Sequence, residues 1–559
     1  MTIDNRFAKD PVTVQIVRNK IASLVDEMHY HFYRSGYSTI IRESRDFSCV
    51  ILDRAGRLIT APPMFFHAPV YRHFIGRILE IFADPQEIRA GDIFVSNHPY
   101  EAGLPHVSDM AFAAPIFAGP RLIGFSGSIA HKADIGGTNP GSTSANATEL
   151  YHEGLLVPPM RMGRAGAEDE GLMRLILANS RQPDLVRGDI RAQIAATEMG
   201  ARRVAELGRR FGAATIEGAF AAILAGTTRA LKAALKPLPD GTEEAVGFMD
   251  DDGVELDRPV KFAVAITVKK GAITFDFSNS GAQAKGPVNL RPSMVEACVF
   301  YALIGALDPE MQFNDGMRDA VKITYAPRTV TNAAPPAPVS SYQKANLKLV
   351  DVILEALGKF RPERAIAGSG SSGSLLINWH EGGRPGHATL QYEIFGSAYG
   401  GGHGHDGTSM TATHLSNLHI TPIEVLESEF PCRILEFSVI PDSGGAGEWR
   451  GGLAFRRRYL LLQDATVVRR YDRARFPSSG AGGGKDGRPS RFAIVGRDGQ
   501  EREMPSSGRF EMKAGEVFYL DKAGGGGWGD PARRDPAALA HDIEELAITP
   551  QAAKRDYGR

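Results

Sequence analysis

The sequence predicts an α+β protein of more than one domain, in which a helix-rich N-terminal half contains a histidine-bearing β-hairpin region and the C-terminal part is β-rich. Three observations predict this class. Before residue 238, apolar residues recur at three- and four-residue steps, the period of an amphipathic helix. Beyond it they begin to alternate, the period of a strand. The chain has 559 residues, more than one hydrophobic core usually organises.

Two to three domains are therefore expected. The stretch LKPLPDG, which begins at Leu235, combines two prolines with a glycine and is typical of a boundary. We predict an N-terminal domain over residues 1–238, a central mixed α/β domain with a glycine- and histidine-rich loop over 239–430, and a β-rich C-terminal domain over 431–559.

The first elements follow from caps and periodicity. Asp10-Pro11 is a good helix start, because the carboxylate can cap the helix and proline is tolerated at the first helical position. The apolar spacing that follows predicts one long helix ending near Gly36. Residues 47–52 and 57–60 flank a turn, which predicts a hairpin, and residues 70–82 predict a second helix.

Two hydrophobic runs, 110–117 and 122–129, form the centre of the N-terminal half. The dipeptide Gly119-Pro120 between them predicts a turn that joins two buried strands. Polar residues cluster at the outer end of each strand: His98, His106 and Asp109 before the first, and His131 and Asp134 after the second. A strand pair can bring these two clusters together.

The two clusters contain ligand types that divalent metal ions prefer. His106-x-x-Asp109 with His131 offers nitrogen, oxygen and nitrogen, a set that suits zinc, manganese or iron and leaves positions open for water or substrate. The alternative is that these residues are separate loop histidines and caps. The three together favour a metal-binding β-hairpin region.

The remaining elements are predicted in the same way. Helices are expected within residues 179–207, 216–235 and 341–357, a hairpin over 262–277, a loop over 331–341, and mostly strands from 441 onward. The run Asp250-Asp251-Asp252-Gly253 lacks the spaced oxygen ligands of a calcium loop, so a turn is expected there. For the glycine- and histidine-rich residues 396–429 we expect a flexible loop closing over substrate, with a second metal site as the alternative.

Composition excludes several classes of protein. Lysine plus arginine (64) nearly equals aspartate plus glutamate (65), so no overall charge favours nucleic acid or an anionic membrane. The three cysteines, Cys49, Cys298 and Cys432, form no CxxC pair, which argues against disulfides and thiolate zinc sites. No signal-peptide pattern and no run of about 18 apolar residues is present, so a cytoplasmic location is expected.

The residues quoted above resemble the hydantoinase B/5-oxoprolinase family, which includes the corresponding subunits of caprolactamase and of acetone and acetophenone carboxylases. The likeness rests first on residues 91–141. It extends to Glu43, Asp46 and Ser48, to the spacing within 181–193, and to the stretches at 441–462 and 523–531. The chain departs from the family at two places: His98 replaces the usual aspartate, and Lys132 follows His131 where many relatives have a second histidine.

The resemblance implies roles for individual residues. Asp46 becomes the best candidate for a fourth metal ligand beside His106, Asp109 and His131, and Asp134 or His98 becomes a candidate for moving protons. One divalent ion, zinc, manganese or iron, is implied as the cofactor. His67, Arg181, Asp189 and Gln193 also fall at positions that match the family, although each suits ordinary packing as well.

The resemblance also implies a partner. Family members work with a larger A-type chain, an actin-like ATPase that uses ATP to phosphorylate the substrate carbonyl. In this chain the run at 482–486 lacks the serine or threonine of a phosphate loop, and the GxGxxG beginning at Gly368 is followed by a strand pattern. ATP is therefore expected on the partner. Most of the eleven basic residues from Arg450 to Arg491 are expected to decorate solvated strands, with a contact to that partner or its nucleotide as the alternative.

Three functional hypotheses follow. The first is the B-type subunit of an ATP-dependent cyclic amidohydrolase, which opens a hydantoin, oxoproline or lactam ring by metal-assisted attack on the phosphate-activated amide within a hetero-oligomer. The second is the equivalent subunit of an ATP-dependent ketone carboxylase. The third is a non-catalytic structural partner.

Overall fold

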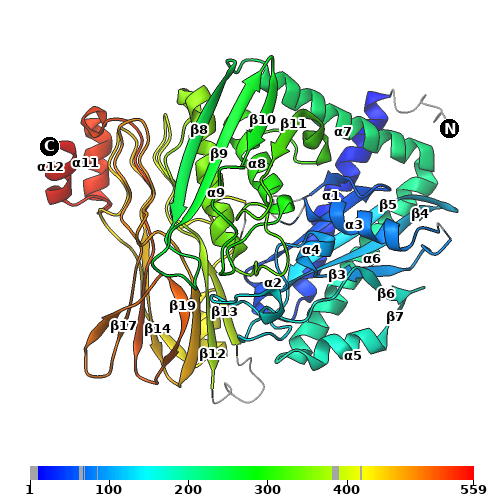
Figure 1. Ribbon diagram of the computed structural model, residues 1–559, viewed down its shortest axis with the longest axis horizontal. Coiled ribbons are helices and arrows are strands. Elements are labelled where there is room, and N and C mark those ends of the chain that lie inside the picture. The colour runs from blue at the N-terminus through cyan, green and yellow to red at the C-terminus, as the bar shows by residue number, and fades with distance from the viewer. Residues whose placement is uncertain (1–9, 62–66, 68, 85, 381–389, 416–417) are drawn as a thin grey trace.

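The structure is a computed structural model that describes residues 10–61, 67, 69–84, 86–380, 390–415 and 418–559. It confirms a mixed α+β protein with several sheets (Figure 1). The helices and large sheet of the N-terminal part occupy one side of the molecule, and the β-rich C-terminal part occupies the other. The signal-peptide expectation rests on residues 1–11, the first nine of which lie outside the described residues.

The N-terminal part is built on a seven-stranded sheet, larger than the hairpins that the sequence predicts. Its strands in spatial order are β2 (Leu58–Thr60), β1 (Phe47–Asp53), β5 (Arg121–His131), β4 (Asp109–Ala118), β3 (Ile93–Ser96), β6 (Met160–Arg164) and β7 (Ala167–Glu168). Both predicted hairpins are confirmed, because β1 pairs antiparallel with β2 and β4 pairs antiparallel with β5. The β4–β5 hairpin lies in the middle of the sheet, which explains why both of its strands are almost continuously buried.

Helices surround this sheet. They are α1 (Pro11–Ser35), α2 (Thr39–Arg42), α3 (Val70–Ile81), α4 (Pro99–Ala102), α5 (Glu170–Ala178), α6 (Pro183–Phe211) and α7 (Ala213–Leu235), with a 3₁₀ turn at Leu150–His152. The predicted cap of α1 is present, because the Asp10 carboxylate accepts hydrogen bonds from the backbone N–H groups of Val12 and Thr13. Helix α6 packs against β4 and β5, and α1 packs against α6 and α7.

The described residues contain no single helix that is both long and apolar enough to cross a membrane. Helices α6 and α7 taken together pass on length and composition, and this pair is bent by 110°.

The central part is a four-stranded sheet with two helices. Its strands in spatial order are β11 (Val321–Thr324), β10 (Ala272–Asp276), β9 (Val260–Lys269) and β8 (Gly241–Met249), and its helices are α8 (Pro292–Leu307) and α9 (Tyr342–Phe360), with a 3₁₀ turn at Asp315–Ala320. The predicted hairpin and the predicted helix after residue 341 are confirmed as β9–β10 and α9. One apolar core contains Phe74 and Ile129 together with Val264 and Ile353, so it runs through both parts. The domain boundaries stay a prediction.

The C-terminal part consists of two antiparallel sheets. The first contains β13 (Leu390–Phe395), β12 (Gly373–Trp379), β16 (Ala465–Arg470) and β19 (Ser507–Met512), and the second contains β14 (Cys432–Val439), β15 (Phe455–Leu461), β20 (Val517–Asp521), β17 (Arg491–Val495) and β18 (Glu501–Glu503). They share one core, in which Leu375 and Val467 of the first sheet pack with Phe455 and Phe518 of the second. Short helices complete the chain: α10 (Ile423–Glu429), α11 (Pro536–Glu544) and α12 (Pro550–Tyr557), with 3₁₀ turns at Pro362–Arg364 and Pro531–Arg533.

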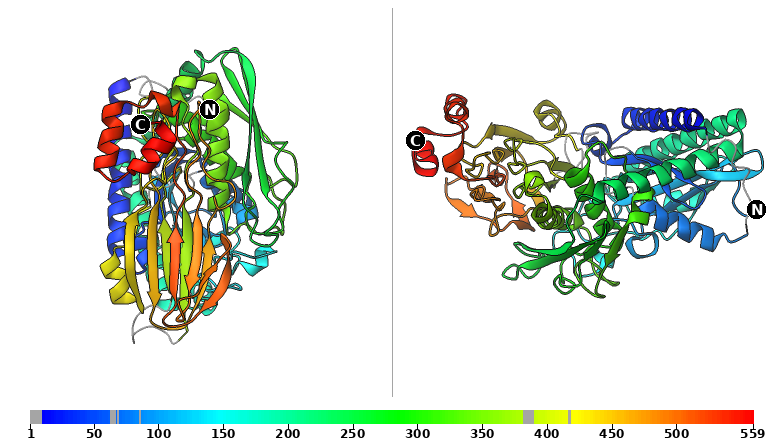
Figure 2. Two further views of the ribbon diagram at one scale, coloured as in Figure 1. Left: turned by 90° about the vertical axis from the view of Figure 1, so that its left-hand side faces the viewer. Right: turned by 90° about the horizontal axis from the view of Figure 1, so that it is seen from above.

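Glycine-rich segments pack together between these sheets and the terminal helices α11 and α12 (Figure 2). A Cβ atom on Gly400 would lie 2.0 Å from the carbonyl oxygen of Ala367, and one on Gly526 would lie 2.1 Å from that of Ser479. Only glycine allows backbones to approach this closely. For residues 396–429 the sequence predicts a flexible loop that closes over substrate. Around Gly400, this stretch is a close-packed part of the fold.

The acidic run after β8 lies in the connection to β9, as the predicted turn requires. The Asp250 carboxylate accepts hydrogen bonds from the backbone N–H groups of residues 474, 475 and 476. The Asp252 carboxylate accepts three more from backbone N–H groups, two in the same connection and one on Gly286. These carboxylates hold chain segments together.

Candidate metal centre

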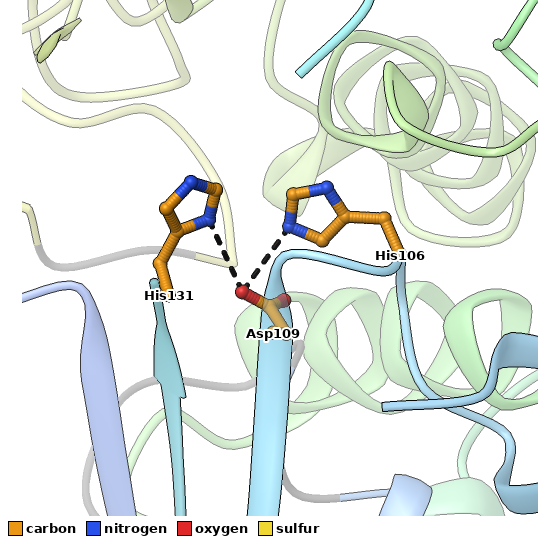
Figure 3. Close-up of side chains that lie close together, drawn as sticks. All are labelled: His106, Asp109 and His131. Atoms are coloured by element: carbon orange, nitrogen blue, oxygen red, sulfur yellow. Dashed lines mark hydrogen bonds and ion pairs between the residues drawn. The ribbon is translucent and has the colours of Figure 1, made fainter. Parts of the chain in front are cut away.

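The β4–β5 hairpin positions two of the three predicted metal ligands. Asp109 is the first residue of β4 and His131 is the last residue of β5. The antiparallel register pairs them directly, so their side chains leave the same face of the sheet as neighbours. His106 lies three residues before Asp109, and its ring points to the same carboxylate (Figure 3). The structure therefore brings together His106, Asp109 and His131, here called the triad.

The triad has a spacing that suits a metal ion. Its ligand atoms all lie within 4.8 Å of one another. Nε2 of His106 is 3.1 Å and Nδ1 of His131 is 3.2 Å from the Asp109 Oδ1 atom. All three residues are buried, with at most 2% of each exposed. No other group of three histidine, cysteine, aspartate or glutamate residues in the described part of the chain meets the same condition.

The donor atoms around the triad are consistent with a bound cation. Asp46 Oδ1 is buried and has no hydrogen-bond partner among the described residues, and the same is true of His131 Nε2 and His106 Nδ1, the ring nitrogens that are not the ones nearest Asp109. An unpartnered buried oxygen is unfavourable unless another group satisfies it, so the Asp46 oxygen is open to a cation. Burial lowers the pKa of His131 and so favours its neutral form. Although burial alone raises the pKa of Asp109, the charge and hydrogen bond of His106 hold this pKa well below its usual value. A carboxylate and a neutral imidazole, the forms favoured for Asp109 and His131, are the forms that ligate metals.

Asp46, the predicted fourth ligand, directly precedes β1, which neighbours β5 in the sheet. Its backbone carbonyl accepts a hydrogen bond from the His131 N–H. Burial raises the pKa of its carboxyl group, and the charge of His131 opposes that rise. The Asp46 carboxylate therefore interacts electrostatically with the triad, but it is not one of the groups that lie within 4.8 Å of one another.

His67 and Tyr342 meet the triad at its carboxylate. His67 Nε2 and the Tyr342 hydroxyl each lie 3.5 Å from the Asp109 Oδ2 atom. The Tyr342 ring also contacts the His106 ring at a centroid distance of 5.0 Å. The sequence is compatible with either a family position or ordinary packing for His67, and the structure places this residue beside the triad.

Two tyrosines at the site were missed by sequence reasoning. Tyr342 begins α9, and Tyr392 lies on β13, where its ring stacks on His131 at a centroid distance of 4.9 Å. Tyr342 lies 233 positions after Asp109 in the chain. Nothing in the local pattern around either tyrosine signals a contact with the hairpin.

His98 lies apart from the triad and caps α4. Its Nδ1 atom accepts hydrogen bonds from the backbone N–H groups of Tyr100 and Glu101. Its Nε2 atom lies 3.7 Å from the Glu101 carboxylate. Burial lowers the pKa of this imidazole. An aspartate, the residue that the family resemblance leads us to expect at this position, would fill the same capping role.

Asp134 also lies outside the triad, and its carboxylate is fully buried. Oδ1 accepts from the backbone N–H groups of Gly136 and Arg181, and Oδ2 accepts from the Gly141 N–H and from Nη1 of Arg181. The carboxylate thus fixes the loop after β5 to the segment before α6. Asp134 and Arg181 therefore form a structural pair that joins these two segments.

Lys132 and Gln193 connect the hairpin to α6. Nζ of Lys132 donates to the Gln193 side-chain oxygen at 2.6 Å, and burial lowers the pKa of this lysine to about 8. The Gln193 amide donates to the backbone carbonyls of Met110 and Ser128, one on each strand of the hairpin. These contacts hold the hairpin that carries the triad in place.

Asp189 lies one turn earlier on α6 and holds a different segment. Its carboxylate accepts hydrogen bonds from the backbone N–H groups of Tyr37 and Ser38, which precede α2. Burial raises its pKa, and the hydrogen bond with Ser38 opposes that rise. Asp189 therefore fixes the entry to α2 against α6.

Two further regions singled out by the sequence are the glycine- and histidine-rich stretch and the basic stretch. His403 and His405 are exposed and belong to no group of potential ligands among the described residues. Within the basic stretch, Arg457, Arg469 and Arg473 are at most 1% exposed. Nη1 of Arg457 lies 3.0 Å from a carboxylate on β13, and Arg469 lies over an aromatic ring of β17 at 4.3 Å. The sequence predicts that most basic residues of this stretch decorate solvated strands, and these three are buried instead. Arg457 and Arg469 lie within the sheets, and Arg473 pairs with the Asp351 carboxylate of α9.

Comparison with known proteins identifies relatives over nearly the whole chain. The family model for hydantoinase B/oxoprolinase matches residues 10–531. The B-type subunit of a putative D-/L-hydantoinase from Pseudomonas sp. (strain NS671) is 30% identical over 98% of this chain and 95% of its own length. The crystal structure of ATP-dependent caprolactamase from Pseudomonas jessenii superposes with a TM-score of 0.90 at 24% identity, covering 98% of this chain and 96% of that one. A nucleotide-free acetone carboxylase structure gives a TM-score of 0.89 at 19% identity, covering 100% of this chain and 80% of that one.

Proposed function

The chain belongs to the hydantoinase B/oxoprolinase family, and on this premise we propose that it is the B-type subunit of an ATP-dependent cyclic amidohydrolase that opens a hydantoin, oxoproline or lactam ring. The observation that carries the proposal is the buried triad of His106, Asp109 and His131, which has the donors and the spacing of a metal site. A single divalent ion, zinc, manganese or iron, fits this donor set.

In this proposal the triad would hold the ion through two nitrogens and one oxygen, and Asp46 would supply a fourth ligand, an oxygen. A cation at this place supplies Lewis-acid activation of a carbonyl or phosphoryl oxygen. His67 and Tyr342 fix the Asp109 carboxylate by its second oxygen. The surrounding burial excludes bulk water, which strengthens every electrostatic interaction at the site.

The proton-transfer roles predicted for Asp134 and His98 stay predictions. The Asp134 oxygens already accept four hydrogen bonds, which favours a role in holding the loop after β5. The Nδ1 atom of His98 is used by the α4 cap. For both residues we propose positioning of the loops beside the triad.

We further propose that ATP is bound by an A-type ATPase partner and that the two chains act as a hetero-oligomer. The hydantoinase relative is itself one subunit of a larger enzyme, and the caprolactamase and acetone carboxylase of known structure are both ATP-dependent. Phosphorylation of the amide oxygen on the partner would turn an unreactive amide into one with a good leaving group. That gain in reactivity is the chemical reason for coupling the two chains.

The test is reconstitution with the A-type partner. We expect bound metal near one ion per chain, and ATP-dependent ring opening of hydantoins or lactams without bicarbonate. Replacing both His106 and His131 by alanine should remove the metal and the turnover, whereas His403→Ala with His405→Ala, a matched exposed pair, should leave both unchanged. A rate within about threefold of the parent after loss of the triad histidines would show that they do not support the transition state, as expected of a structural partner.

The second candidate function is the corresponding subunit of a ketone carboxylase. It is supported by the fold that the chain shares with acetone carboxylase over its whole length. Assays of the same reconstituted complex distinguish the two functions. A ketone carboxylase forms product only when ketone and bicarbonate are both supplied, whereas a cyclic amidohydrolase needs no bicarbonate.

A further inference from the structure

The triad is buried, so a ligand needs a route to it. The side chains of His106, Asp109 and His131 are at most 3% exposed. The Tyr392 ring stacks on the His131 ring at 4.9 Å with an angle of 26° between the ring planes. The same tyrosine lines a cavity of about 220 Å³. One aromatic ring therefore lies between this cavity and the triad.

This cavity, here called the α2 pocket, lies where α2, the start of α6 and β13 meet. It is continuous in sequence with the metal site, since Ala133 in its wall is two residues beyond His131. Thr39 adds a hydroxyl group, and Arg42 and Glu429 form an ion pair of 3.1 Å at the pocket. The apolar lining consists of Tyr37, Ile40, Ala133, Leu185, Leu390 and Tyr392.

The outer wall of the α2 pocket is held in place before any ligand arrives. The backbone N–H groups of Tyr37 and Ser38 donate to the buried Asp189 carboxylate at 2.7 and 3.2 Å. The Tyr37 ring lies so close to α6 that a Cβ atom on Gly188 would be 2.2 Å from it. The glycine and the aspartate at adjacent positions of α6 thus fix both the ring and the backbone of Tyr37.

We propose that the α2 pocket is the substrate subsite of the triad, and that the Tyr392 side chain is the barrier that a ligand displaces to reach His131. This inference rests on the proposed function and adds the place where the ring binds. The hydrocarbon edge of a cyclic amide packs on Ile40, Leu185 and Leu390, and its polar edge reaches the Thr39 hydroxyl. The volume lies below that of typical drug-sized sites, about 300–1,000 Å³, so small rings without bulky substituents are selected.

The first test measures metal exchange, which does not depend on turnover. The purified complex is loaded with Zn²⁺, and its release to a chromogenic chelator is followed. Tyr392→Ala should speed release by about tenfold, because it removes the side chain whose motion gates the path. Tyr392→Phe keeps the ring and should release at the parent rate. Leu185→Trp fills the pocket and should slow release.

The matched control is Ala195→Trp. Ala195 lines a different cavity, beside the β6–β7 hairpin, of about 250 Å³, so filling it should leave the release rate unchanged. If Zn²⁺ release is unchanged in Tyr392→Ala or in Leu185→Trp, the route through the α2 pocket is wrong. It is also wrong if Ala195→Trp slows release as much as Leu185→Trp does. Failure of the complex to take up Zn²⁺ would overturn the metal centre and the route together.

The second test measures selectivity. Leu185→Ala enlarges the pocket and should raise kcat/KM for a 5-substituted hydantoin relative to hydantoin itself by about tenfold, the usual effect of a few methylene groups in a pocket. If metal exchange responds as expected but no variant turns over a cyclic amide, the route stands and the proposed function fails. If hydantoin is turned over but neither exchange nor selectivity responds to Leu185, the proposed function stands and this inference fails.

Discussion

Asp109 is the residue on which the site converges. Its Oδ1 atom meets the imidazoles of His106 and His131, and its Oδ2 atom meets His67 and the Tyr342 hydroxyl. Four side chains from four places in the sequence thus share one carboxylate. Since these partners surround a single buried charge, the position of Asp109 is fixed from both sides, which is the rigidity that a metal site needs.

Glu153 is a second buried acid, and it provides a test of stability against pH. Its carboxylate accepts hydrogen bonds from the backbone N–H groups of Val339 and Ser340, but burial raises its pKa from 4.5 to about 8. The folded state therefore favours the protonated form. The stabilisation is complete below the unfolded pKa of 4.5 and is lost as the pH rises toward 8.

Glu153→Gln removes this ionisation. We expect the Tm of the variant, relative to that of the parent, to rise steadily between pH 4.5 and pH 8, as measured by differential scanning fluorimetry. The exposed neighbour Glu149 supplies the control, and Glu149→Gln should follow the parent at every pH. A Tm difference that stays constant across this range would show that Glu153 is not held protonated by the fold.

Among the secondary-structure elements, the β4–β5 hairpin and the short helix α4 build the site in different ways. The hairpin brings Asp109 and His131 together by register, so a shift of one residue would turn one of them to the opposite face. Helix α4 contributes through its cap, because His98 holds the backbone of Tyr100 and Glu101. The hairpin supplies candidate ligands, whereas the cap of α4 fixes the backbone conformation at the start of that helix.

His98 can be tested by separating capping from proton transfer. Asparagine caps helices but transfers no proton, so His98→Asn should keep the Tm and the turnover of the reconstituted complex. His98→Ala should lose about 0.5–2 kcal/mol, the usual cost of a lost cap, and lower the Tm. If His98 instead moves a proton, His98→Asn should reduce turnover about a hundredfold while the Tm stays the same.

In the molecule as a whole, the site lies where three parts meet. Asp109 and His131 belong to the seven-stranded sheet and His106 to the loop before it, whereas Tyr342 belongs to a helix of the central part and Tyr392 to the C-terminal sheets. A ligand that binds only this assembled arrangement stabilises all three parts together. Metal binding and overall stability should therefore be linked.

Metal removal tests this link. Dialysis against a chelator should lower the Tm, and Zn²⁺ should restore it, because a ligand at a hundred times its Kd adds about 2.7 kcal/mol to the folded state. The variant with both His106 and His131 replaced by alanine should show no response to Zn²⁺. A Tm that is insensitive to chelation in a metal-loaded parent would contradict a role for the ion in joining the parts.

Local structure and the members of the triad could be predicted from the sequence. The spacing of apolar residues predicted α1, the β1–β2 and β4–β5 hairpins and α9, because burial of one face repeats with the period of the element. Ligand chemistry at the two strand ends predicted His106, Asp109 and His131, since an antiparallel hairpin brings its first and last residues together. These features depend on residues that lie close together in the sequence.

The distant partners of the triad were settled by packing and could not be predicted. Packing placed Tyr342 and Tyr392 against the histidines, used His98 as a cap and Asp134 as a loop anchor, and enclosed Arg457 between two sheets. The physical reason is that periodicity records whether a residue is buried, but not which element buries it. That choice depends on how whole sheets and helices fit together, and one sequence position carries no signal of its partner hundreds of residues away.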